Sequence, residues 1–495
     1  MIAAAGHALD AGPATDAAAA ADLVERAVYL AAGSFGYDVA IRLAEARLPL
    51  LRRFAEPDEQ ARADVDVARL RLRSGRGYDR VVELLERALA TYLALGDTES
   101  AGAVHSRLGG TLVVPRPGMD VVRSLEHFAA AERLLPDASD LFSLHRGRLS
   151  AAIVSVSSAC MAAAVDRCAA IALSSNRPQL DVAAGWGRGW LSLDRGRPTA
   201  ALAYLEDAWS AATDLGDPLL GWAPANAGAL ICTVYLLDPT MGRSWCRRGL
   251  GQRRFDTLTH PNDALADQLA LALATTGEMD AAERAVARLP AEAVARRLVR
   301  FLLGDWEDAA AQWRSALEQD LAAGDRHDAV ASARWLADAL LALGDEPGAV
   351  ETLDLALEIA VSAPQAPSEV AIRARLAGLP GTAPEQAVVH LSRCEEVAVA
   401  GEDWRGLAGE VAMARAAVAL KQHDWAAAAA AASEGAAVFQ TYRLPWQRAA
   451  ALQSLSRALA GAGRVREARA GREAADAVLV GIGASQRWRS GVLPA

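Results

Sequence analysis

The chain has 495 residues and a formal net charge of −10 at pH 7. This acidic balance argues against nucleic acid as a direct partner, because non-specific affinity for nucleic acid depends on cations that neutralise phosphates. Aromatic residues make up only 5% of the chain while alanine is abundant, which favours closely packed helices over sheets. We therefore predict an all-α protein.

Residues 1–20, MIAAAGHALDAGPATDAAAA, form an Ala/Gly-rich N-terminus that we expect to be flexible. The segment lacks the positive start and the unbroken apolar core of a signal peptide. No later stretch offers the roughly eighteen uncharged apolar residues that a membrane span requires. These features predict a soluble, cytoplasmic protein that does not bind membranes.

Glycines recur at a fixed interval in the N-terminal helical-repeat region, residues 21–215, and again in residues 277–485. Four pairs lie twenty residues apart and one lies twenty-one apart: Gly196 and Gly216, Gly304 and Gly324, Gly381 and Gly401, Gly463 and Gly483, and Gly75 and Gly96. Gly344 follows Gly324 by another twenty residues, so two helices and two turns repeat about every forty residues. This period predicts a solenoid of roughly two dozen antiparallel helices, in which each hairpin contacts only its neighbours.

The segment 216–276 departs from this phase, and we predict an irregular repeat with long loops. Helical periodicity persists only from about Ala225 to Leu237. The segment is either a ligand loop or hinge, or simply two helix-to-helix loops of unusual length. Its arginines would either meet a phosphate or an acidic peptide, or lie on a solvated helix face beside neighbouring acids: Arg243, Arg247, Arg248, Arg253 and Arg254.

Residues 302–329, LLGDWEDAAAQWRSALEQDLAAGDRHDA, contain one complete helix and its turns. Their apolar positions share one helix face: Ala309, Ala310, Trp313, Ala316, Leu317 and Leu321. We expect Asp305 to cap this helix by accepting hydrogen bonds from free backbone N–H groups. Gly324 is expected to end it in the left-handed conformation. Residues 486–495 are predicted to be a tail after the last repeat.

Alanines recur five and twelve residues after four of the turn glycines. They are Ala201 and Ala208 after Gly196, Ala309 and Ala316 after Gly304, Ala349 and Ala356 after Gly344, and Ala468 and Ala475 after Gly463. Small residues at these positions would let the second helix of a hairpin approach the first closely.

No motif for catalysis or for a cofactor is present. The lone lysine, Lys421, stands outside any phosphate-binding loop, and neither H-E-x-x-H nor G-x-S-x-G occurs. The paired carboxylates Glu395 and Glu396 would point in different directions on a helix. We predict a non-enzymatic protein without a cofactor or a metal.

The five cysteines show no C-x-x-C and no Cys/His spacing suited to zinc. We predict that all five are reduced core residues: Cys160, Cys168, Cys232, Cys246 and Cys394.

Residues 334–360, RWLADALLALGDEPGAVETLDLALEIA, resemble a tetratricopeptide repeat, with Leu336 in the first helix, Gly344 in the turn and Leu353 in the second helix. The period of about forty, rather than thirty-four, is more similar to the long-helix version C-terminal to the ATPase module of large LuxR-type transcriptional regulators. Residues 441–484 resemble that class in particular. The resemblance extends over most of residues 60–485 and implies a right-handed α-solenoid.

The resemblance weakens near Gly304, where Arg296, Arg297 and Arg300 replace the expected apolar and small residues. The chain also shows neither the ATPase module nor the DNA-binding helix-turn-helix of those regulators. It is therefore expected to be a standalone relative or a separated fragment.

The resemblance further implies that a concave groove is lined by the first helix of each hairpin, at positions ten and six residues before the turn glycine. For Gly196 this register gives Trp186 and Trp190, which would anchor a peptide or a small molecule. It would also place Gly185 and Gly189 against the partner helix. The alternative is that both tryptophans fill the hairpin core. The remaining candidate groove residues are Asp267, Arg334, Asp338, Gln453 and Arg457.

A groove of mixed charge with an aromatic floor suits a peptide better than a polyanion. We therefore predict a scaffold or sensor domain that binds a protein or peptide in bacterial signalling or transcription regulation. The alternative function is a receptor domain that binds a small effector molecule inside the superhelix.

Overall fold

The computed structural model describes all residues except 12–15, 35, 75–76, 115–117, 136–140, 217, 252–258, 399–400 and 491–495. The chain forms two compact units. Unit 1 comprises Met1–Val154 with Arg254–Asn262, and unit 2 comprises Ser155–Arg253 with Asp263–Ala495. Every regular element among the described residues is a helix, so the predicted all-α class is confirmed.

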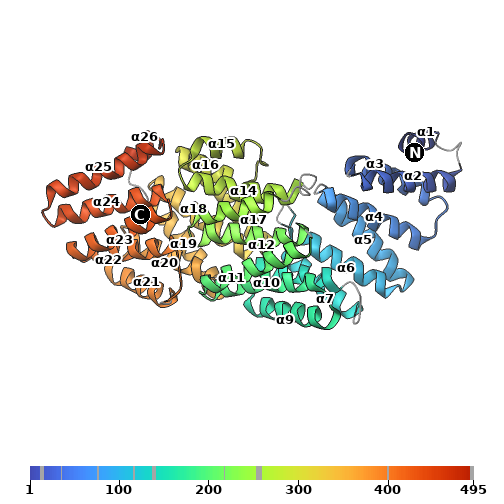
Figure 1. Ribbon diagram of the computed structural model, residues 1–495, viewed down its shortest axis with the longest axis horizontal. Coiled ribbons are helices and arrows are strands. Elements are labelled where there is room, and N and C mark those ends of the chain that lie inside the picture. The colour runs from blue at the N-terminus through green and yellow to red at the C-terminus, as the bar shows by residue number, and fades with distance from the viewer. Residues whose placement is uncertain are drawn as a thin grey trace. The chain divides into compact units, whose positions relative to one another are not determined.

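Unit 1 consists of helices that pack in sequence order (Figure 1). They are α1 (Ile2–Asp10), α2 (Ala17–Gly33), α3 (Tyr37–Leu51), α4 (Pro57–Ser74), α5 (Tyr78–Leu95), α6 (Thr98–Leu112), α7 (Val121–Leu134) and α8 (Leu141–Val154). The terminus that we expected to be flexible therefore includes α1 and the start of α2. Ala5 of α1 is buried against Val24 and Ala27 of α2, which gives this short helix an apolar contact.

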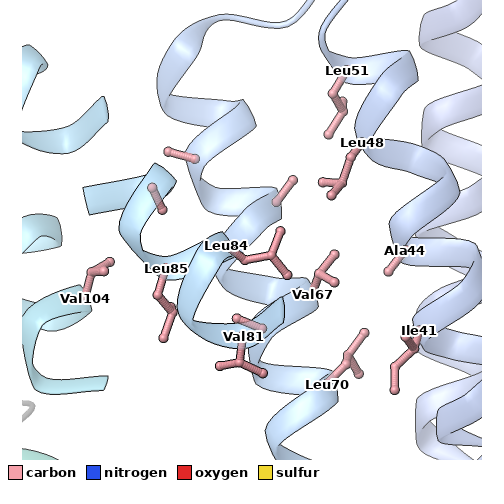
Figure 2. Packing of buried hydrophobic residues seen from close by; sticks show 14 of the residues in the cluster. Ile41, Ala44, Leu48, Leu51, Val67, Leu70, Val81, Leu84, Leu85 and Val104 are labelled. Carbon is pink, nitrogen blue, oxygen red and sulfur yellow. The ribbon is translucent and has the colours of Figure 1, made fainter. Parts of the chain in front are cut away.

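The core of unit 1 around α5 is mostly aliphatic. Leu84 and Leu85 of α5 lie among Leu48 of α3, Val67 of α4 and Val104 of α6 (Figure 2). Leu84 and Leu85 are fully buried. Burial of this apolar surface is the main force that holds consecutive helices together, at about 25 cal/mol per Å² of apolar surface removed from water.

Unit 2 continues with further helices in hairpins, except that the first residues of α14, up to Asn262, belong to unit 1. They are α9 (Ser158–Ser175), α10 (Pro178–Asp194), α11 (Pro198–Asp214), α12 (Pro218–Leu230) with the π-helical turn η2 (Ile231–Tyr235), α13 (Pro239–Leu250), α14 (Thr259–Thr275), α15 (Met279–Val286), α16 (Val294–Leu303), α17 (Trp306–Ala323), α18 (Arg326–Ala342), α19 (Glu346–Ser362), α20 (Ala366–Gly378), α21 (Pro384–Val397), α22 (Leu407–Lys421), α23 (Trp425–Thr441), α24 (Pro445–Gly461), α25 (Val465–Gly481) and α26 (Gln486–Ser490).

The structure confirms the predicted roles of the in-phase alanines and of the turn glycine Gly324. The alanines five and twelve residues after Gly196, Gly304, Gly344 and Gly463 are all buried. Gly324 ends α17 with a left-handed φ of 75°. Asp305 does occupy the N-cap of α17, but its side chain makes no capping hydrogen bond, so this detail of the prediction is wrong. Gly75 lies outside the described residues.

The segment 216–276 is far more helical than its prolines and glycines suggested. Pro239 stands in the first turn of α13, where a missing N–H costs nothing, and Asp238 caps that helix by accepting a hydrogen bond from the N–H of Met241. Gly228 and Gly242 serve close packing rather than turns, because a Cβ on either would clash with a neighbouring side chain. The expected helical limit at Leu237 is therefore wrong.

Hairpins in unit 2 also contact hairpins much further along the chain. Arg405 pairs with Asp238, Trp446 donates its indole N–H to the carbonyl of Ala274, and Trp488 donates to the carbonyl of Leu302, at separations of 167, 172 and 186 residues. Such evenly staggered contacts arise when successive turns of a superhelix touch. The expectation that each hairpin contacts only its neighbours therefore fails in unit 2.

The predicted domain limits differ from the observed units. No unit boundary falls at residue 215 or 276, and the chain changes unit after Val154 instead. The predicted tail contains α26, whose Trp488 packs against Phe301, Trp306 and Trp446. Neither the short length of α26 nor its polar sequence QRWRS indicates this docking in advance.

Candidate binding surface

The first helices of the hairpins in unit 2 lie close to one another, as the sequence register implied. α20 contacts α10, α18 and α22, although these four helices belong to different hairpins. We call the surface that these helices share the inner face. Most of the predicted groove residues lie on α10, α18 and α24, and the inner face is therefore the candidate binding surface.

Trp190 lies on the inner face but is only 4% exposed. Its ring stands edge-on to His327 at a centroid distance of 4.8 Å and to Tyr235 at 6.1 Å. The hydroxyl of Tyr235 lies 3.0 Å from Nε2 of His327, so the three side chains form one buried group. Burial raises the pKa of Tyr235 well above its usual value, which keeps the phenol neutral.

The other predicted tryptophan, Trp186, is half-buried, one helical turn before Trp190. On the opposite side of α10, a Cβ built at Gly185 would lie 3.0 Å from Cβ of Ala208, and one at Gly189 would lie 2.8 Å from the side chain of Leu205. Both glycines thus pack against α11 as expected. The ring of Trp190 contacts side chains of α18 and η2, which belong to other hairpins.

Arg334 and Asp338 line a small pocket on the inner face. Its walls come from α18, α19, α20 and α22, and it opens to solvent. We call it the Arg334 pocket, and it is lined by Arg334, Trp335, Asp338, Leu353, Ala371, Arg375 and Glu410.

Arg375 holds the two acidic residues of the pocket. Its Nη2 donates to Asp338 at 3.0 Å, and its Nη1 lies 4.0 Å from a carboxylate oxygen of Glu410. Burial opposes the charge of Arg375, but Asp338 and Glu410 raise its pKa overall. Arg375 is thus fixed by charge-assisted contacts inside the pocket.

Arg334 is in a different situation. It makes no hydrogen bond or ion pair with any residue in the described part of the chain, although Asp338 and Glu410 are near enough to affect its pKa. Burial is the larger effect and lowers that pKa. A guanidinium has five N–H donors, so this side chain retains capacity to bind an added acceptor.

The remaining predicted residues have separate positions. Asp267 on α14 accepts hydrogen bonds from the backbone N–H groups of Val294 and Ala295, at 3.2 and 2.8 Å, and so caps α16. This cap is a structural role that the register did not indicate. On α24, Gln453 is half-buried and Arg457 bonds to Ser454 of its own helix at 2.9 Å.

Several acids of unit 2 are held in an environment that disfavours their charge. Burial raises the pKa of Asp194 to about 8, of Asp320 to about 7 and of Asp267 to about 6. For Asp320 the neighbouring charge of Asp328 acts in the same direction, while the hydroxyl of Ser332 donates a hydrogen bond that partly offsets it. These acids contribute less negative charge near neutral pH than their number suggests.

Sequence reasoning missed half of the charged residues of the pocket. Arg375 lies six residues before Gly381, so the same register applied to that glycine would have found it. Glu410 lies on α22, where His423 rather than glycine adopts the left-handed turn conformation, with φ 59°. Without a turn glycine, the sequence offered no register for that helix.

The described arginines of segment 216–276 fit the second alternative given above, in which they lie on a helix face beside neighbouring acids. Arg243 pairs with Glu278, and Arg248 pairs with Glu206 while its guanidinium lies 4.7 Å from the ring centroid of Trp245. Arg253 and Arg254 lie outside the described residues.

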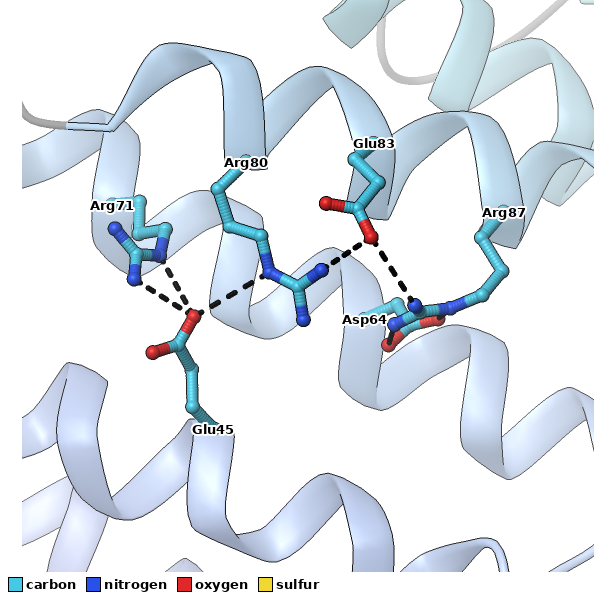
Figure 3. Close-up of polar contacts among 6 residues, drawn as sticks. All are labelled: Glu45, Asp64, Arg71, Arg80, Glu83 and Arg87. Atoms are coloured by element: carbon cyan, nitrogen blue, oxygen red, sulfur yellow. Dashed lines mark hydrogen bonds and ion pairs between the residues drawn. The ribbon is translucent and has the colours of Figure 1, made fainter.

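Unit 1 carries a further charged cluster, which sequence reasoning also missed. Arg71 and Arg80 meet Glu45, and Arg87 holds Asp64 by two hydrogen bonds of 2.5 and 2.6 Å (Figure 3). The two arginines at Glu45 come from different helices, α4 and α5, and Asp64 lies on α4. These charges satisfy one another across α3, α4 and α5, which is typical of a structural network rather than a binding site.

Other predictions concern the chain in general. Cys168, Cys232, Cys246 and Cys394 are buried and free, but Cys160 is exposed, so its assignment to the core is wrong. No helix in the described parts is long and apolar enough to span a membrane. The same parts contain no cluster of three His, Cys, Asp or Glu side chains arranged for a metal.

No protein-family model matches the sequence, and no curated protein matches it. Among solved structures, the APC/C hetero-tetramer Cut9–Hcn1 is similar over 93% of this chain and 87% of its own, with 12% identity and a TM-score of 0.50. Yeast Tom70 is similar over 91% and 97%, with 15% identity and a TM-score of 0.32. A Rap protein complexed with Competence and Sporulation Factor is similar over 78% and 99%, with 12% identity and a TM-score of 0.35.

The similarity to Cut9–Hcn1 concerns the fold alone, because so few residues are identical. Together with the helical hairpins described above, it establishes a tetratricopeptide-like α-solenoid. The resemblance of residues 334–360 to a tetratricopeptide repeat is thereby confirmed at the level of fold.

Proposed function

We propose that the chain is a non-enzymatic scaffold or sensor that binds a protein or peptide on the inner face of unit 2. Its place in a bacterial signalling or transcription-regulatory system is part of the same proposal, and rests on the LuxR-type resemblance of residues 441–484. The similar fold of Cut9–Hcn1 occurs in a hetero-tetramer, which supports an assembly role for such a solenoid.

The observation that carries the proposal is the chemistry of the inner face. A solenoid core needs only apolar side chains, and the contacts within hairpins do use buried alanine and leucine. The inner face instead holds charged groups such as Arg334, Asp338 and Glu410, whose removal from water is costly. A recognition surface accounts for that cost, since polar groups give a site its specificity.

A capture experiment tests this function. The full chain is immobilised and exposed to native lysate, and the bound proteins are compared with those held by Trp186→Ala on the inner face. Arg469→Ala is the matched control, because Arg469 lies on α25 with an 82% exposed side chain and, among the described residues, pairs with Glu473 of the same helix alone. We expect specific capture to fall with Trp186→Ala and to persist with Arg469→Ala. Equal capture by both variants would refute a role for the inner face.

A second function, a receptor for a small effector molecule, is favoured by a different observation. The Arg334 pocket is small, partly buried and open to solvent, and four charged side chains converge on it, of which Arg334 has no partner among the described residues. A thermal-shift screen of metabolites with the full chain tests this function. A ligand that stabilises the wild-type chain but not Arg334→Gln would support it.

A further inference from the structure

Two histidines of unit 1 face each other across neighbouring helices. His105 lies on α6 and His127 on α7, and their Nδ1 atoms are 2.8 Å apart. The ring centroids lie 5.0 Å apart, with the ring planes tilted by 45°. Both side chains are half-buried, so solvent reaches them. When both rings are neutral, one Nδ1–H donates a hydrogen bond to the lone pair of the other Nδ1.

We propose that His105 and His127 together bind one divalent transition-metal ion of the Ni²⁺ or Cu²⁺ class through their Nδ1 atoms. The proton that joins the two Nδ1 atoms moves to Nε2 of its own ring, so each ring keeps one proton and presents one lone pair to the ion. Water supplies the remaining ligands, because the described residues include no third His, Cys, Asp or Glu that would complete a metal cluster.

The separation of the two nitrogen atoms indicates the coordination geometry. Metal–imidazole bonds are about 2.0–2.1 Å long, so two nitrogens at 90° on one ion lie about 2.8–3.0 Å apart, and at the tetrahedral angle roughly 3.3–3.4 Å apart. The observed 2.8 Å fits adjacent positions of a square-planar or octahedral ion. Square-planar and tetragonal nitrogen sites are typical of Cu²⁺ and Ni²⁺, whereas Zn²⁺ is usually tetrahedral.

The backbones beneath the pair are already held at a fixed distance. Phe128, the residue after His127, packs so closely on Gly109 of α6 that a Cβ on this glycine would lie 2.8 Å from the ring. The hydroxyl of Ser124 on α7 donates to the carbonyl of Gly109 at 2.7 Å. The spacing of the two imidazoles is therefore set before an ion binds, which lowers the cost of ordering the site.

The surroundings of the pair permit a cation. Burial lowers the pKa of His105 to about 4, with His127 acting in the same direction, and burial also lowers the pKa of His127. Both rings are thus neutral near pH 7, the form that coordinates metals. The other charged groups that affect these pKa values sum to zero: Arg123, Arg133, Glu86 and Asp120. No excess of positive charge therefore repels an ion from the pair.

The site belongs to unit 1 and does not involve the inner face of unit 2. It therefore goes beyond both functions proposed above, and neither the capture experiment nor the metabolite screen decides it. An ion bound to both rings links α6 to α7 and adds its binding free energy to the stability of this hairpin.

Calorimetric titration of the untagged full chain with NiCl₂ tests the proposal. Ni²⁺ is the probe because, unlike Cu²⁺, it does not readily oxidise a thiol such as the exposed Cys160. We expect saturable binding of one ion per chain at micromolar concentration and weaker binding of ZnCl₂. MgCl₂ should give no binding heat, because Mg²⁺ prefers oxygen ligands. Absence of Ni²⁺ binding, or Zn²⁺ binding as tight as that of Ni²⁺, would overturn the proposal.

Two variants assign the ion to the pair. His105→Gln and His127→Gln each remove one ligand and should weaken Ni²⁺ binding at least about ten-fold, since loss of a residue that merely orients a metal ligand already costs roughly 10–100-fold. His390→Gln is the matched control, because His390 is half-buried on α21 and its Nδ1 has no hydrogen-bond partner among the described residues. It should bind Ni²⁺ as the wild type does. Unchanged affinity in both variants of the pair would refute the site.

Chemical modification of the wild-type chain gives an answer that does not depend on the folding of a variant. Diethyl pyrocarbonate acylates free imidazoles, and peptide mapping by mass spectrometry locates the products. We expect Ni²⁺ to protect His105 and His127, while the exposed His423 is modified equally with and without the ion. Equal modification of His105 and His127 in the presence and absence of Ni²⁺ would contradict coordination by the pair.

Discussion

Trp190 illustrates how one side chain can lie on the predicted surface and still be buried. The register correctly placed it on the first helix of its hairpin, opposite Gly189. Residues from η2 and α18, however, cover the ring, and these elements begin 41 and 136 residues later in the chain, at Ile231 and Arg326. A register derived from one hairpin carries no information about such distant contacts.

Replacement of Trp190 by alanine should therefore reduce the stability of unit 2. The change removes the ring contacts with Tyr235 and His327 and leaves a cavity, so we expect a loss of about 3–5 kcal/mol in the free energy of unfolding. Guanidinium denaturation followed by circular dichroism measures this loss. The half-buried Trp186→Ala should cost distinctly less. An unchanged denaturation midpoint for Trp190→Ala would show that the ring is not part of the packed interior.

Arg334 and Arg375 lie in one pocket but should respond differently to replacement. Arg375→Gln leaves Asp338 without its partner, which should cost roughly 2–4 kcal/mol, somewhat less than for a fully buried pair. Arg334→Gln breaks no hydrogen bond to a described residue and removes a desolvated charge, so its unfolding free energy should stay nearly unchanged or rise. Denaturation of both variants under the same conditions measures the difference. Equal losses would mean that Arg334 has a structural partner.

At the scale of elements, buried acids at the ends of α10 and α17 make stability depend on pH. The folded state holds protons on Asp320 up to pH about 7 and on Asp194 up to about 8, whereas an unfolded Asp releases its proton near pH 4. At these two positions the folded chain therefore binds more protons than the unfolded chain across this window. Their contribution to stability falls as the pH rises from about 4 to about 8.

Comparison with Asp320→Asn isolates this effect. Asparagine keeps an acceptor for the hydroxyl of Ser332 but does not titrate, so the loss of stability between pH 5 and pH 8 should be smaller in the variant than in the wild type. Denaturant titrations at both pH values measure the difference. The comparison cancels His105 of unit 1, whose pKa is lowered to about 4 by burial and which acts in the opposite direction. Identical pH slopes would contradict a protonated Asp320 in the folded state.

Element by element, the sequence predicted the parts of the fold that depend on local chemistry. Left-handed glycines such as Gly304 and Gly344 marked helix ends, and the alanines in phase with them marked close contacts within hairpins. The same logic failed at Gly228 and Gly242, because a glycine needed for close packing looks like a glycine needed for a turn. The former packs against Trp245 and the latter against Thr233, and neither has a positive φ.

At the scale of the whole of unit 2, contacts between successive superhelical turns are what the sequence could not reveal. The repeat period and the helix caps depend on residues that are close in sequence. The ion pair between Asp238 and Arg405, in contrast, joins residues that are 167 positions apart. Both side chains are largely buried, with exposures of 7% and 17%. The inner face of unit 2 is thus bounded by hairpins that contact one another over long sequence separations. Access to this face depends on those long-range contacts as well as on the inner helices.

The contacts of α26 allow these long-range interactions between superhelical turns to be tested. Trp488 contacts Phe301 and Trp306, and Arg487 pairs with Glu307 while its guanidinium lies 4.3 Å from the ring centroid of Trp306. A chain that ends at Ser485 lacks this helix, so the turn between α16 and α17 loses its cover although it lies about 180 residues away in sequence. We expect faster amide exchange at the start of α17, because local opening there no longer breaks these contacts.

Hydrogen exchange followed by mass spectrometry distinguishes this result from the behaviour of an ordinary solenoid. If hairpins interacted only with their neighbours, deletion of α26 would affect α25 alone. With contacts between superhelical turns, exchange should rise in α16 and α17 as well, while α21, which contributes none of the aromatic rings around Trp488 in the described structure, stays unchanged as an internal control. The variant Trp488→Ala should reproduce most of the effect without shortening the chain, since its ring fills the space among Phe301, Trp306 and Trp446. Changes confined to α25 would show that the turns of unit 2 move independently in solution.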